Sequence, residues 1–168
     1  KAFNNHLEGN FEKAQTLYKS ILKYVPDHFD TLRHLGILYQ DRHMLEMAEK
    51  YYENEEWRRA STLFEQIQPK YRGKPQGERI TFFYANSLLN KKNYVLAAFQ
   101  FESFVKSYPI SQKVEEAAFN AAYCYYKQSP KHSLDQADTM TAIEKLQNFI
   151  NFYPYSEKLE EANDLVQE

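Results

Sequence analysis

The chain has 168 residues, 43% of them hydrophobic and 16% aromatic, and can bury one elongated or one ordinary globular core. Its formal net charge of −2 gives no basic excess that would indicate nucleic acid or an anionic membrane surface as a partner, and no apolar run approaches the ~18 residues that span a bilayer. Its four glycines lack the spacing of a nucleotide-binding loop, and one cysteine, Cys124, excludes an internal disulfide and a cysteine-based zinc site.

Three segments align without gaps and predict one kind of helix. In each, an alanine precedes a proline by twelve residues, and large apolar residues follow the alanine at positions four and seven. This spacing marks one face of an α-helix, on which the small alanine lets a neighbouring helix approach, and the proline ends the helix. The pairs are Ala14–Pro26, Ala97–Pro109 and Ala142–Pro154, and a fourth copy at Ala60 has Arg72 in place of proline.

A second kind of helix precedes most of these segments. Ala48 stands twelve residues before Ala60, and Ala85 stands twelve residues before Ala97. Before the last copy the equivalent residue is Ala122, displaced by an eight-residue insertion in the polar stretch 128–138. The chain is therefore predicted to repeat a helix–turn–helix unit, with a long loop at this insertion.

A ten-residue segment recurs in the last two repeats. The segment Tyr-Pro-x-Ser-x-Lys-x-Glu-Glu-Ala at 108–117 recurs 45 residues later at 153–162. Ser111 and Ser156 are each predicted to be the N-cap of a helix, because a serine hydroxyl can accept a hydrogen bond from an exposed backbone N–H there. The glutamates would then lie in the first helical turn, where the helix dipole favours negative charge.

The segment Leu35-Gly36-x-x-Tyr39, together with the alanine and proline pattern, resembles the tetratricopeptide repeat, a helical hairpin of about 34 residues. The spacings between the second-helix alanines are 46, 37 and 45 residues, because loops such as 71–78 and 128–138 lengthen the repeat. The resemblance implies an all-α solenoid of tetratricopeptide-like helical hairpins.

The first spacing contains an anomaly. Counting from Gly36, a regular array would place its next second-helix alanine at position 48, but Ala48 already belongs to a first helix. Either one helix serves two phases of the array, or a helix is missing. We therefore divide the chain into residues 1–43, tetratricopeptide-like helices of divergent or non-native origin, and residues 44–168, about three repeats. The chain begins with Lys1 rather than methionine and is expected to be a partial product, with the array truncated at its C-terminus.

Residues 44–168 resemble the BamD-like lipoproteins of the outer-membrane β-barrel assembly machinery. The segments 45–52 and 57–65 resemble the first repeat of that family, 101–109 the second, and 129–139 the loop before the third. The resemblance implies a non-enzymatic scaffold on the periplasmic side of the outer membrane, held by a lipid anchor that this chain lacks. Its implied partners are the barrel-assembly subunit and unfolded outer-membrane proteins.

The first helices of a solenoid line its concave face, which is the predicted binding site. Aromatic rings beside amide and charged groups there suit an extended peptide, while the alternative for each ring is packing between repeats. The predicted contact residues are Tyr52, Arg79, Phe82, Asn86, Asn90, Phe119, Tyr123, Tyr126 and Lys127.

No catalytic, cofactor or metal site is predicted. The five histidines form no i, i+4 pair, Cys124 has no partner base in its helix, and the paired glutamates are adjacent in sequence. Two alternatives to the barrel-assembly scaffold remain. One is a general tetratricopeptide adaptor for another peptide or subunit, and the other is an accessory repeat domain of a larger protein.

Overall fold

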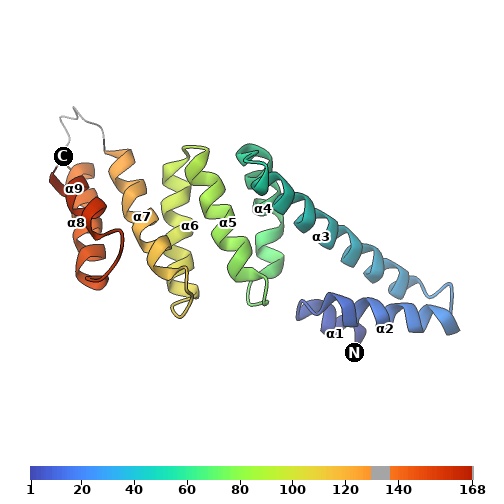
Figure 1. Cartoon of the computed structure of the whole chain (residues 1–168). Helices are drawn as coiled ribbons and strands as arrows, with labels where there is room; N and C mark the ends of the chain where they lie inside the picture. The colour runs from blue at the N-terminus through green and yellow to red at the C-terminus, as the bar shows by residue number, and fades with distance from the viewer. Residues whose placement is uncertain (130–136, 168) are drawn as a thin grey trace. The chain divides into compact units, whose positions relative to one another are not determined.

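Helices account for all the regular structure in the described part of the chain. The computed structural model describes residues 1–129 and 137–167, and within these ranges it contains no strand (Figure 1). The prediction of an all-α, tetratricopeptide-like fold is confirmed. The helices are α1 (Ala2–Leu7), α2 (Phe11–Tyr24), α3 (Phe29–Glu53), α4 (Trp57–Tyr71), α5 (Gly77–Asn90), α6 (Tyr94–Ser107), α7 (Val114–Gln128), α8 (Ala137–Phe152) and α9 (Leu159–Gln167).

The alanine and proline pattern has the structural meaning that the sequence suggests. The four second-helix alanines are all buried, so neighbouring helices do approach at these positions. Helices α2, α6 and α8 each end two residues before the proline, because proline disfavours the helical conformation of the residue that precedes it. The buried alanines are Ala14, Ala60, Ala97 and Ala142.

The chain forms two compact units, Lys1–Ile80 and Thr81–Glu168. In the second unit, α6 packs against α7, α7 against α8, and α8 against α9. Phe119, Leu146 and Phe149 form the centre of the core that α7, α8 and α9 share. Of the predicted loop at 128–138, residues 130–136 lie outside the described residues.

In the first unit, α3 is a single helix of 25 residues, and the expected division at residues 43 and 44 falls in its middle. Its first half packs with α1 and α2, where Leu38 joins Ala2 and Tyr18 in one buried cluster. Its second half packs against α4. One continuous helix thus serves two phases of the array. The separate origin of residues 1–43 stays a prediction.

The prediction that the two serines are N-caps is wrong. The N-cap of α7 is Lys113, and its side chain makes no capping hydrogen bond. Ser111 and Ser156 lie earlier, in the turns before α7 and α9, where their hydroxyls accept hydrogen bonds from the backbone N–H groups of Lys113 and Lys158, both at 3.0 Å. The Ser156 hydroxyl also donates to Glu115 Oε1 at 2.5 Å, and so connects this turn to α7 of the preceding repeat.

The lysine of the echoed segment makes a second connection between repeats. Lys113 Nζ lies 5.5 Å from the ring centroid of Phe82, and Lys158 Nζ lies 5.2 Å from that of Phe119. Each lysine also pairs with the glutamate three residues after it, at 2.9 and 2.8 Å. The 45-residue echo therefore encodes a cation–π contact in which each repeat covers an aromatic ring of the one before it.

A buried polar group holds α1 to the rest of the first unit. His6 is buried between Phe11 and Tyr18, and its Nε2 lies 4.0 Å from Asp41 Oδ2 on α3. The other Asp41 oxygen accepts from Lys70 Nζ of α4 at 2.6 Å. Burial, followed by the nearby ammonium group of Lys74, lowers the pKa of His6 below its ordinary value of 6.5.

We therefore expect the first unit to lose stability as pH falls below about 6.5, because the unfolded chain takes up a proton that the folded His6 resists. Urea midpoints between pH ~7.5 and pH ~5.5 measure this effect. His6→Gln should flatten the pH dependence, whereas His43→Gln, at an exposed position on α3, should leave it unchanged. An equal slope in all three proteins would contradict the assignment to His6.

Candidate functional site

The aromatic side chains of α7 form a continuous row. Phe119, Tyr123 and Tyr126 are spaced by four and three residues, which places them on one face of the helix. The rings of Phe119 and Tyr123 are stacked with centroids 6.2 Å apart, and those of Tyr123 and Tyr126 are 6.3 Å apart. Phe119 is only 3% exposed, whereas both tyrosines are half-buried. The row thus runs from the core to the surface.

Lys127 ends this row. Its Nζ lies 5.1 Å from the ring centroid of Tyr123 and 5.4 Å from that of Tyr126, and the side chain is exposed. A side-chain hydrogen bond with Tyr123 raises the pKa of Lys127. The ammonium group is therefore charged at neutral pH, and it can meet a carboxylate or a peptide carbonyl beside two aromatic faces.

The predicted residues on α5 that belong to the second unit lie deeper. Phe82 is buried, with its ring centroid 5.4 Å from that of Phe104, and Asn86 is also buried. Asn90 is exposed, but its side-chain amide donates to the backbone oxygen of Asn86 at 2.9 Å. For Phe82, as for Phe119, this burial favours the core-packing alternative over direct contact with a peptide.

The two remaining residues belong to the first unit. Tyr52 is half-buried, and its ring packs edge-on against those of Trp57 and Phe64, at centroid distances of 5.4 and 6.4 Å. Arg79 is exposed and pairs with Glu49, whose pKa burial raises. The predicted set is thus divided between the units, and the structure brings Phe119, Tyr123, Tyr126 and Lys127 together as the α7 row.

Sequence reasoning missed a groove on the second unit. It has a volume of about 380 Å³, and α6, α7 and α8 line it. Lys145 Nζ of α8 pairs with Glu102 Oε1 of α6 at 2.6 Å, and Tyr125 of α7 donates to the same oxygen at 3.3 Å. The small residues Ala118 and Ala121, at helical spacing on α7, are the sequence signal that could have indicated it.

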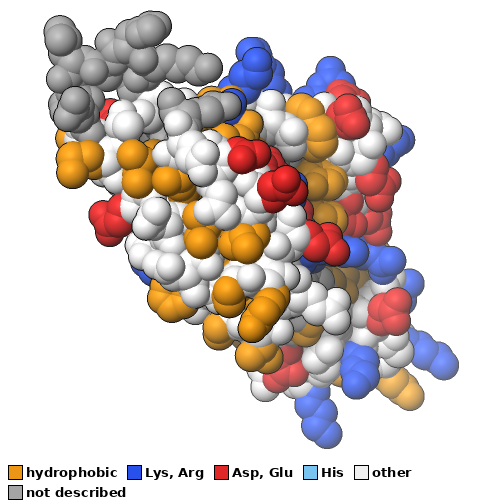
Figure 2. Space-filling model, turned by 60° about the vertical axis from the view of Figure 1, so that its left-hand side comes forward, with side chains coloured by type: hydrophobic (Ala, Val, Ile, Leu, Met, Phe, Trp, Pro, Cys, Tyr) orange, Lys and Arg blue, Asp and Glu red, His pale blue; other side chains and the backbone are white. Residues whose placement is uncertain are grey.

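Two features of the described residues bear on metal binding and thiol chemistry. Residues 1–129 and 137–167 contain no group of three or more His, Cys, Asp or Glu that could hold a metal ion. Burial raises the pKa of Cys124 to about 12, which leaves the thiol protonated and unreactive. Figure 2 shows hydrophobic side chains on the surface in small groups, separated by polar and charged ones. In the described part of the chain, no helix has both the length and the apolarity to cross a membrane.

Comparison with known families agrees with this architecture. The family model described as outer membrane lipoprotein (YfiO) matches residues 39–167, which include α4 to α9 and the second half of α3. No protein with a curated description matches the chain. The family resemblance of the repeats is confirmed by the match, and the chain belongs to the YfiO family of outer membrane lipoproteins.

Proposed function

We propose that this chain is a non-enzymatic scaffold in outer-membrane β-barrel assembly, which binds the barrel-assembly subunit and unfolded segments of outer-membrane proteins. In this proposal it works on the periplasmic side of the outer membrane, where a lipid anchor holds it. The family match over residues 39–167 supports the cellular setting. The α7 row supports the binding of peptide segments, and it is the observation on which the proposal rests.

The α7 row suits the chemistry of an unfolded barrel strand. Such strands alternate apolar and polar residues, so an extended strand directs every second side chain toward one surface. The half-buried rings of Tyr123 and Tyr126 offer two adjacent faces for these side chains. Lys127 adds a charged donor for a carbonyl or a terminal carboxylate of the same peptide.

The double variant Tyr123→Ala with Tyr126→Ala is expected to weaken binding of a fluorescent peptide at least about tenfold, because aromatic anchors dominate interfaces of this kind. The peptide should carry the alternating pattern of a barrel strand, and anisotropy reports its binding. Tyr155→Ala is the matched control, because this tyrosine is 98% exposed and lies outside the row. Circular dichroism should show unchanged helicity in both proteins.

Three results separate the possibilities. Wild-type affinity in the double variant would reject the α7 row as the peptide site. Equal affinity for a peptide of the same composition without alternation would favour a general tetratricopeptide adaptor. Absence of binding by the wild-type chain to any strand peptide would reject the proposed role in substrate recognition.

A further inference from the structure

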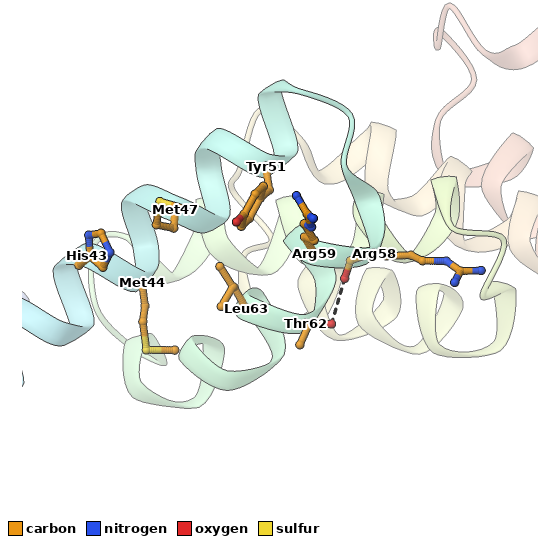
Figure 3. A pocket seen from close by; sticks show the side chains of 8 residues that line it. All are labelled: His43, Met44, Met47, Tyr51, Arg58, Arg59, Thr62 and Leu63. Atoms are coloured by element: carbon orange, nitrogen blue, oxygen red, sulfur yellow. Dashed lines mark hydrogen bonds between the residues drawn. The ribbon is translucent and has the colours of Figure 1, made fainter.

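The first unit carries an open apolar groove along the second half of α3. Its volume is about 530 Å³, and side chains of α3 and α4 line it (Figure 3). Figure 3 shows Met44 and Met47 on α3, and Leu63 on α4, around the same hollow. The lining residues are His43, Met44, Met47, Tyr51, Arg58, Arg59, Thr62 and Leu63.

Aligning the repeats shows which residues of the second unit correspond to those of this groove. First-helix Ala48 corresponds to Ala122, and second-helix Ala60 corresponds to Ala142, so α3 and α4 are the counterparts of α7 and α8. The groove residues Met44, Met47, Tyr51 and Leu63 then correspond to Ala118, Ala121, Tyr125 and Lys145.

In the second unit these counterparts face a helix. Tyr125 donates to Glu102 of α6, and Lys145 pairs with the same carboxylate. Ala118 and Ala121 line the groove to which α6 contributes. A preceding second helix, α6, thus forms one wall of the groove that these counterparts line.

The first unit has no helix at this position, and the reason is the continuity of α3. A regular array would place a second helix between the two phases, but α3 runs through both without a turn. Helix α2 packs on the first phase, where Leu38 is buried and Gln15 donates to Tyr39 at 2.7 Å. The described residues of the first unit provide no further helix to cover the second phase.

The groove side chains differ from their counterparts in size and polarity, and the differences favour contact with a separate partner. Met44 and Met47 stand where α7 has alanines, and Leu63 stands where α8 has a lysine, so the side chains at these three positions are longer or less polar than their counterparts. Methionine side chains adapt to different partners. All the lining residues are described, and none is acidic. The charged side chains at the α4 end are Arg58 and Arg59.

The two arginines have different surroundings. Arg59 pairs with Glu56 at 2.6 Å and lies 5.5 Å from the ring centroid of Tyr51. The side chain of Arg58 is exposed and extends from the helix, with its guanidinium directed away from Met44 and Met47 (Figure 3). Arg59 therefore places positive charge beside Tyr51 at one end of the apolar floor, and Arg58 adds a second exposed charge beyond that end.

We propose that this groove binds one amphipathic helix of a partner protein, which takes the position of the absent second helix. The helix places apolar residues on Met44, Met47 and Leu63 and directs acidic residues at Arg58 and Arg59. In the second unit, α6 and α8 run in parallel, since Glu102 lies beside Lys145 and Lys106 lines the same groove as Phe149. By the same geometry the bound helix runs parallel to α4, with its acidic residues in its N-terminal half. This inference does not depend on the proposed peptide site of α7.

The protein provides its own probes for a test. It has three methionines, two in the groove and the third, Met140, 67% exposed on α8. Isotope-labelled methionine methyl groups therefore give three NMR signals. The ligand is a synthetic helical peptide of about 16 residues, with leucines at helical spacing and glutamates in its first two turns. We expect the Met44 and Met47 signals to shift on titration and the Met140 signal to stay in place.

Variants test the two parts of the recognition. Met47→Lys should raise the peptide Kd at least about tenfold, because the ammonium group would be buried without a partner, while Met140→Lys should leave it unchanged. The paired change Arg58→Glu with Arg59→Glu should weaken binding of the acidic peptide and reduce its sensitivity to salt. The α7 variant Tyr123→Ala with Tyr126→Ala should bind this peptide normally, which separates this proposal from the proposed function.

Each contrary result overturns a stated part of the proposal. Absence of Met44 and Met47 shifts in the wild-type protein rejects the groove as a helix site. Equal affinity for a peptide with lysines in place of the glutamates rejects an acidic partner. Shifts that follow protein concentration without peptide, together with dimers in sedimentation, would show that a second copy of the chain occupies the groove instead.

Discussion

Phe104→Ala is expected to lower the free energy of unfolding by about 3–5 kcal/mol, because it removes a fully buried ring and leaves a cavity. The Phe104 ring packs between Phe82 and Tyr108, with centroid distances of 5.4 and 5.2 Å. Urea unfolding followed by circular dichroism measures the loss.

Phe99→Ala is the matched control for this substitution. Phe99 is on the same helix, α6, but is 64% exposed, so its truncation should change the free energy of unfolding by no more than about 0.5 kcal/mol. The two variants thus distinguish the buried face of α6 from its exposed face. Similar losses in both would show that the helix is rotated relative to its neighbours.

Ala97→Leu is expected to lower the free energy of unfolding by about 1–3 kcal/mol, because it overpacks the core where Phe104→Ala leaves a cavity. Ala97 is fully buried at the position that every second helix reserves for a small residue, so a larger side chain forces the helices apart. Val95→Leu enlarges an apolar side chain that is 65% exposed on the same helix, and it should leave the melting midpoint almost unchanged. An unchanged midpoint for Ala97→Leu would reject the repeat register from which the groove on α3 and α4 is compared with the second unit.

The helices were predictable because the features that mark them are local. Each second-helix alanine marks a close approach of two helices, and the proline twelve residues after three of them marks a helix end, so the end of α6 could be predicted from Ala97 and Pro109. Helix α1 carries neither mark, and the pattern could not indicate it. The same pattern showed that Ala48 does not fit a regular array, but it could not show that one continuous helix is the reason. The continuity of α3 depends on the absence of a turn, which no residue type marks directly.

The candidate site was predictable only in part, because burial depends on neighbouring helices. Helical spacing correctly places Tyr123 and Tyr126 on one face of α7. Spacing cannot show that Lys158, from the next repeat, lies over the ring of Phe119. Nor can it show that the side-chain amide of Asn90 donates a hydrogen bond to the backbone of its own helix. The open groove on α3 was still harder to predict. A groove is formed by a missing neighbour, and its residues look like an ordinary core face in the sequence.

The lysine–phenylalanine contact between repeats shows where a repeat can be lengthened without disturbing its packing on the next one. It joins residues 31 positions apart in Phe82 and Lys113, and 39 positions apart in Phe119 and Lys158. Most of this difference lies in the connections at 91–93 and 129–136, which follow the C-terminal ends of α5 and α7, whereas the contact forms near the N-terminal end of each first helix. The contact between successive repeats therefore does not depend on the length of the connection inside a helical hairpin. A foreign segment grafted between α7 and α8 should leave the stacking intact, which makes this connection the natural point for an epitope or a protease site.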